Sequence, residues 1–72
     1  MNEKQAMMND MVRELALLLI EDNHITMEEA LDTVFNSETY SKLTDERTGL
    51  YFQSPRYVYD FLKTELLSGK MG

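Results

Sequence analysis

"TMEEALDTVFNSETYSKL", residues 26–43, decides the fold of this chain because it contains two helix start signals in close succession. Thr26 and Glu29 have the T-x-x-E spacing of a capping box, in which the threonine oxygen accepts from the N3 amide and the glutamate reaches back to the cap. The apolar residues that follow mark one helical face: Met27, Leu31, Val34 and Phe35. This pattern predicts a helix over residues 27–36.

A second, shorter helix is expected directly after a break at Asn36 and Ser37. Ser37 is a favourable N-cap residue, and the charge of Glu38 suits the positive end of the helix dipole. Tyr40 and Leu43 would be its inward residues, which predicts a helix over 38–43. Two consecutive helices joined in this way are also typical of a helix-turn-helix.

A longer helix is expected before these two, over about residues 3–22. Its apolar residues recur at the spacing of one helical face: Met8, Met11, Val12, Leu15, Leu18 and Leu19. Ala16, Leu17 and Ile20 widen the stripe, so the helix should be deeply buried or shared between two chains. The sequence leaves two interpretations open, which are ordinary core packing and self-association through a surface centred on Met8, Met11, Leu15 and Leu19.

The chain then turns and enters a last helix. Gly49 suits the left-handed position of the turn, and the short aromatic segment "LYFQ", residues 50–53, predicts a strand. Ser54 and Pro55 fit the N-cap and N1 positions of a final helix, which Gly69 would end. Its expected inward residues are Val58, Phe61, Leu62 and Leu66.

The order of these elements predicts a mainly α fold. We expect one compact domain over residues 1–72, with three to four helices and a short strand or β-turn before the last helix, similar to a winged helix. A chain of 72 residues has a thin core, so contact with another chain is one way for it to gain burial.

Aromatic residues are concentrated in the second half of the chain. Tyr51 and Phe52 would point to opposite faces of a strand, and Tyr59 would look away from the inward face of the last helix. These rings either supply core mass or form a protein-binding patch with the neighbouring Arg56, since tyrosine and arginine are enriched in binding hot spots. The candidate interface residues in this region are therefore Tyr51, Phe52, Arg56 and Tyr59.

The net charge of −6 is unevenly distributed. Residues 1–38 contain nine acids and two bases, whereas residues 39–72 contain four acids and five bases. Nucleic-acid binding depends on neutralising phosphates, so this balance favours a basic or polar protein partner over a nucleic acid. A winged-helix-like DNA-binding regulator is the alternative, with Lys42, Arg47 and Arg56 near its second helix and wing.

The sequence lacks the residues that metal binding, nucleophilic catalysis and phosphate binding usually require. Cysteine is absent, and the single histidine, His24, has no neighbouring ligand or nucleophile, so we expect no metal and no catalytic residue. The three glycines are isolated, which excludes a phosphate-binding glycine loop. We expect no cofactor, no small-molecule substrate and no enzymatic activity. The N-terminus does not resemble a signal peptide and no apolar run could cross a bilayer, so a cytoplasmic location without a membrane contact is expected.

The segment "EEALDTVFNSETYSKLTDERTGLYFQSPRYVYDFL", residues 28–62, resembles a family of small bacterial proteins of unknown function. These proteins are often encoded beside putative toxin-like ADP-ribosyltransferase genes. The resemblance consists of a capped helix, an aromatic second helix, a "TG" turn, a short aromatic segment and a "YVY"-like final helix. It implies a small helical accessory or antitoxin-like partner. Together with the composition, it predicts a non-enzymatic protein-interaction module that binds another protein or a second copy of itself.

Overall fold

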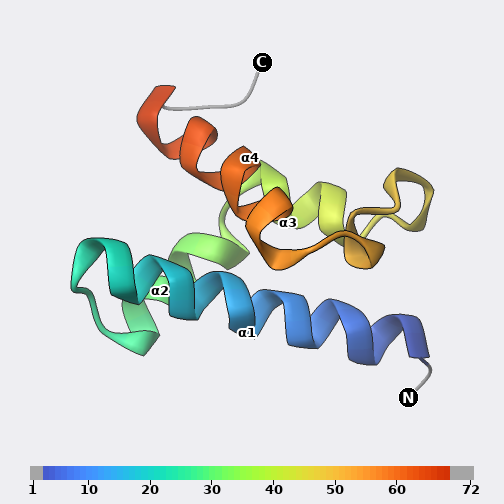
Figure 1. Ribbon diagram of the computed structural model, residues 1–72, viewed down its shortest axis with the longest axis horizontal. Helices are drawn as coiled ribbons and strands as arrows, with labels where there is room; N and C mark the ends of the chain where they lie inside the picture. The colour runs from blue at the N-terminus through green and yellow to red at the C-terminus, as the bar shows by residue number, and fades with distance from the viewer. Residues whose placement is uncertain (1–2, 69–72) are drawn as a thin grey trace.

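Four α-helices and two 3-10 turns make up the computed structural model, which describes residues 3–68 (Figure 1). The elements are α1 (Glu3–Asn23), α2 (Met27–Phe35), α3 (Glu38–Leu43), η1 (Glu46–Thr48), η2 (Leu50–Phe52) and α4 (Pro55–Ser68). The long helix α1 forms one side of the molecule; α2, α4 and η2 pack against it, and α3 packs against α4. The predicted mainly α domain is confirmed.

Both predicted helix starts in residues 26–43 are confirmed. The Thr26 hydroxyl accepts from the backbone nitrogen of Glu29 at 3.1 Å, and the Glu29 carboxylate accepts from the backbone nitrogen of Thr26 at 3.1 Å. At the start of α3, the Ser37 hydroxyl accepts from the backbone nitrogen of Tyr40 at 3.0 Å. These side chains satisfy amide groups that have no partner within their own helices.

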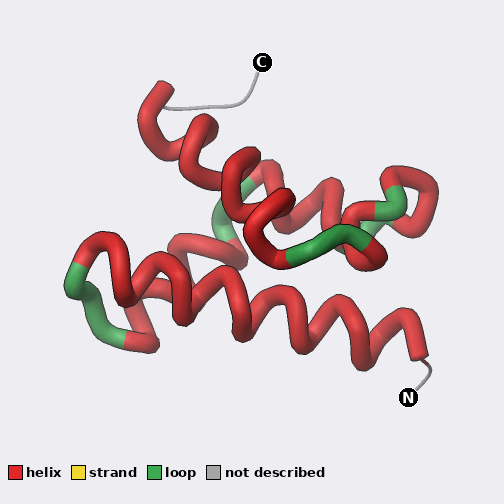
Figure 2. The backbone as a smooth tube through the Cα atoms, in the orientation of Figure 1, coloured by secondary structure: helices red, strands yellow, loops and turns green. Residues whose placement is uncertain are grey.

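The strand predicted over residues 50–53 is wrong. Within residues 3–68 the structure contains no strand, and Figure 2 shows only helix and loop in this part of the chain. The backbone nitrogens of Phe52 and Gln53 donate to the carbonyls of Gly49 and Leu50, which closes a 3-10 turn. Local bonds of this kind satisfy the backbone without a neighbouring strand. The strand that a winged-helix-like arrangement would need before the last helix is therefore not formed by the described residues.

The turn residues on either side of η2 follow the sequence prediction. Gly49 has the left-handed φ of 68° that the pattern indicated. Ser54 accepts from the backbone nitrogen of Tyr57 at 3.2 Å, and Pro55 is the first residue of α4. Gly69, the predicted end of α4, lies outside the described residues.

The apolar stripe of α1 forms one side of the hydrophobic core. Met8, Met11, Leu15 and Leu19 are all buried within the single chain. They pack in one cluster with residues of the other elements: Ala30, Val34, Leu43, Tyr51, Val58, Tyr59 and Leu62. The surface expected for self-association is thus covered by the chain itself, because α2, η2 and α4 lie against it. Of the two interpretations of this stripe, the burial agrees with core packing.

The inward face of α4 differs from the predicted one. Val58 and Leu62 are buried as expected, but Phe61 and Leu66 are exposed. Tyr59 and Glu65 are buried in their place, because both have polar partners on other helices that the spacing of apolar residues does not reveal. The helix is therefore turned so that its inward stripe includes two residues with polar tips.

Candidate protein-binding surface

The four interface candidates in residues 51–59 do not share one exposed face. Tyr51 and Tyr59 are buried, whereas Phe52 and Arg56 are exposed. The ring of Phe52 lies against that of Tyr51, with 4.3 Å between their centroids, and Phe52 is 67% exposed. The patch that the sequence suggested is thus reduced to Phe52 and Arg56, because the two tyrosines are part of the core.

Tyr59 is held inside by a long-range hydrogen bond. Its hydroxyl donates to the Asp22 carboxylate at 2.7 Å, which joins the middle of α4 to the end of α1. Burial and this bond both favour the neutral phenol, so the pKa of Tyr59 is raised well above its ordinary value of 10.0. The Tyr59 ring has a structural role, and it is not available to a partner.

The surface that sequence reasoning missed lies on α2. Ala30 and Val34 are buried against the core, while Met27 and Phe35 are 40% and 51% exposed and Leu31 is half-buried. Met27, Leu31 and Phe35 are spaced four residues apart, so they form one row along the helix. We call this row the α2 stripe. Its origin is visible in the sequence: the apolar arc of α2 is wider than a single contact with α1 can cover.

Tyr40 extends the α2 stripe onto the next helix. Its ring meets that of Phe35 edge to face, with 5.1 Å between the centroids and an angle of 88° between the planes. Edge-to-face pairs of this kind are favourable beyond the area that they bury. The break at residues 36–37 brings the end of α2 and the first turn of α3 together, so an aromatic pair closes one end of the surface.

Glu65 fixes the start of α3, which carries Tyr40. Its carboxylate accepts from the backbone nitrogens of Glu38 and Thr39 and from the Thr39 hydroxyl, at 2.8, 3.0 and 2.8 Å. Burial opposes the charge of Glu65 and would raise its pKa, but these hydrogen bonds together outweigh burial and lower the pKa below its ordinary value of 4.5. A charged side chain of α4 thus sets the position of the helix that completes the surface.

An open groove of about 610 Å³ lies on the outer side of α2, and its lining residues all belong to α2 or its N-cap. Its lining combines parts of the stripe with the acidic edge of the helix: Thr26, Glu28, Glu29, Leu31, Asp32 and Phe35. Glu29 is occupied by the capping box, and Asp32 accepts from the Asn36 side chain at 3.1 Å. Within residues 3–68, none of the three carboxylates forms an ion pair with a basic side chain. The groove therefore offers an apolar floor beside unneutralised negative charge.

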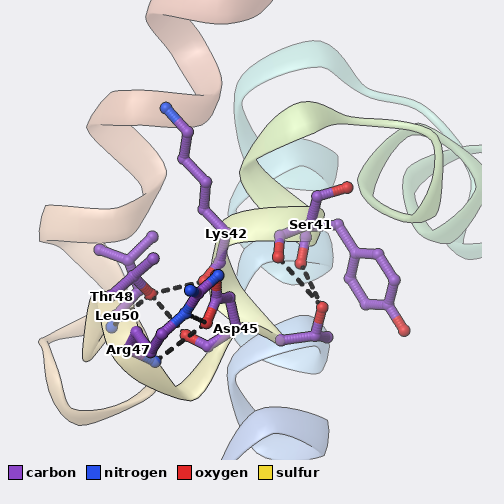
Figure 3. Close-up of polar contacts among 8 residues, drawn as sticks. Ser41, Lys42, Asp45, Arg47, Thr48 and Leu50 are labelled. Carbon is purple, nitrogen blue, oxygen red and sulfur yellow. Dashed lines mark hydrogen bonds and ion pairs between the residues drawn. The ribbon is translucent and has the colours of Figure 1, made fainter.

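The polar groups of the turn between α3 and η2 form hydrogen bonds with one another, as Figure 3 shows. The Asp45 carboxylate accepts two bonds from the Arg47 guanidinium, at 3.1 and 2.9 Å, and these bonds lower the pKa of Asp45. The Thr48 hydroxyl donates to the carbonyls of Lys42 and Asp45 and accepts from the backbone nitrogen of Leu50. These contacts shape the turn, and they point to a structural role.

Residues 3–68 contain no group of three or more histidine or acidic side chains placed to hold a metal ion. None of the helices there combines the length and the apolar character that crossing a membrane requires. No family model, curated protein or solved structure matches this chain.

Proposed function

We propose that this chain is a non-enzymatic protein-interaction module and that it binds its partner through the α2 stripe and the groove beside it. The observation that carries the proposal is the exposure of Phe35 and Met27 on a helix that buries Ala30 and Val34 against the core. An aromatic ring that is half exposed beside a hollow is the type of anchor that binding hot spots use. An accessory or antitoxin-like protein would act in this way, by covering a surface of its partner.

The arrangement of α2 and α3 supports this choice of surface over Phe52. The α2 stripe has several apolar side chains in a row and ends in a paired ring, whereas Phe52 is a single exposed ring stacked on a buried one. The position of the α2 stripe is also well fixed, because the capping box holds one end of α2 and Glu65 holds the start of α3. A rigid surface loses little conformational entropy when a partner binds.

The test uses two matched phenylalanines. Phe35 and Phe61 are both substantially exposed, and each makes an edge-to-face pair with a tyrosine, Tyr40 and Tyr57 respectively. The full chain and the variants Phe35→Ser and Phe61→Ser would each be used to isolate bound proteins from the native cells. Circular dichroism would first show that all three chains are folded to the same degree.

The proposal expects one protein to be recovered in a fixed ratio with the unmodified chain and with Phe61→Ser, and to be lost with Phe35→Ser. Recovery that depends on Phe61 and not on Phe35 would place the binding surface on α4. The absence of any protein in a fixed ratio with the unmodified chain would contradict the interaction module itself.

A further inference from the structure

We infer that the partner segment bound in the α2 groove is a basic amphipathic helix, with apolar anchors on one face and lysine or arginine beside them. This inference rests on the proposed function and adds the chemistry of the partner. It follows from two features of the same surface, which are the row of apolar side chains and the sign of the charge along its edge.

The apolar feature fits a helix as the occupant. Met27, Leu31 and Phe35 lie along α2 at intervals of four residues, so the exposed row follows the helix axis. Recognition of an amphipathic helix by a hydrophobic groove uses anchors at i, i+3, i+4 and i+7, which also form a row along one axis. The two rows can therefore lie side by side, with the Phe35–Tyr40 ring pair at the end of the groove.

The charge feature selects a basic occupant. Glu28, Glu29 and Asp32 line the groove, and α2 contains no basic residue. None of these carboxylates is paired with a base among residues 3–68. An apolar segment without basic residues would leave the carboxylates at its edge unpaired, and an acidic segment would be repelled.

A symmetric contact between two copies through their α2 grooves does not meet that requirement. Contact between two α2 grooves would bring Glu28, Glu29 and Asp32 of one copy close to the same residues of the other. Like charges at close range disfavour such a contact. The net charge of −6 also disfavours the association of two copies, because both carry the same sign of charge.

The test measures the binding of two fluorescent peptides to the full chain by anisotropy. One is a helical peptide of leucine and lysine, about 14 residues long so that it spans about 21 Å, and the other has glutamate in place of every lysine. The protein variants are Phe35→Ser and the pair Glu28→Gln with Asp32→Asn. The matched controls are Phe61→Ser and the pair Glu21→Gln with Asp60→Asn, which removes the same charge from exposed positions elsewhere.

The inference expects the lysine peptide to bind and the glutamate peptide not to bind. Phe35→Ser should lower the affinity of the chain for the lysine peptide by about tenfold, which corresponds to about 1.4 kcal/mol of binding free energy. The double variant Glu28→Gln with Asp32→Asn should lower this affinity by about fivefold. This loss should vanish at about 1 M salt, where exposed charges are screened within about 3 Å. The two controls should change the affinity by less than about twofold.

Three outcomes would overturn the inference: no binding of the lysine peptide, equal binding of the glutamate peptide, or equal losses for the α2 variants and their controls. The proposed function is tested separately by the Phe35-dependent recovery of a cellular protein. If that protein is recovered while the lysine peptide fails to bind, the proposed interaction module is supported and the inferred basic helical partner is contradicted.

Discussion

Thr39 is bound by Glu65 through both its backbone nitrogen and its hydroxyl, at 3.0 and 2.8 Å, although 26 residues separate the two in the chain. A side chain of α4 thus caps the N-terminal end of α3. Because α3 carries Tyr40, which packs on Phe35, this bond supports the proposed binding surface from behind. The structure therefore links the stability of the fold to the geometry of the surface.

Replacing Glu65 with glutamine should destabilise the protein by about 1–3 kcal/mol, since an amide nitrogen would then face one of the backbone donors. The pH dependence should change as well. The pKa of Glu65 is lowered in the folded state, so its stabilising effect is complete above its ordinary value of 4.5 and is lost as the pH falls through the folded value. Chemical unfolding between about pH 3 and pH 6 measures this: the difference between the wild-type chain and Glu65→Gln should shrink as the pH falls. A difference that stays constant would contradict the capping role.

Tyr59→Phe should cost about 1 kcal/mol of stability, because it removes a buried hydroxyl that donates to Asp22. The pKa of Tyr59 is raised in the folded state, so this stabilisation is present below its ordinary value of 10.0 and is lost as the pH rises above it. Denaturant unfolding between about pH 8 and pH 11 should therefore show a steeper loss for the wild-type chain than for Tyr59→Phe. The exposed residue Tyr57 is the control, and a Tyr57→Phe variant that flattens the profile equally would contradict the assignment.

His24→Gly should stabilise the protein by about 0.5–1 kcal/mol, because His24 has a left-handed φ of 54° directly after α1. Gly49→Ala should do the opposite. An added Cβ at Gly49 would meet no atom within 4 Å, so its cost of about 1 kcal/mol would come from the backbone conformation alone. Thermal unfolding of the two variants measures both effects, and a destabilised His24→Gly would mean that the histidine side chain itself stabilises the helix end.

Leu15→Ala should destabilise the chain by about 2–5 kcal/mol, since Leu15 is fully buried between α1 and its neighbours. Leu17→Ala, two positions away on the exposed side of α1, should change the stability by less than about 0.5 kcal/mol. Urea unfolding compares the two. Similar losses at both positions would mean that the exposed side of α1 is also covered, for example by a second chain.

Local signals predicted the helix starts well. The capping box at Thr26, the N-cap at Ser37 and the left-handed Gly49 each depend on residues close in sequence, so the pattern contains all that is needed. The strand over residues 50–53 failed because aromatic residues favour strands only where a partner strand exists, and local 3-10 bonds satisfied this segment instead.

The orientation of α4 and the location of the binding surface could not be read in the same way. The hydrogen bond to Asp22, which lies 37 residues earlier, holds Tyr59 inside. Hydrogen bonds from the start of α3 hold Glu65 inside in the same way. Both contacts join segments that the sequence does not show to be neighbours. For α2, the width of the apolar arc was visible, but which part of it α1 covers depends on how the two helices pack.

The measurement that tests the central claim most directly is chemical-shift mapping of the isotope-labelled chain with its isolated partner. If the α2 groove is the binding surface, the amide signals of residues 26–36 and of Tyr40 should shift in proportion to the bound fraction. Signals of the exposed residues Phe52 and Phe61 should stay in place. Shifts confined to η2 and the outer face of α4, with α2 unchanged, would contradict the account.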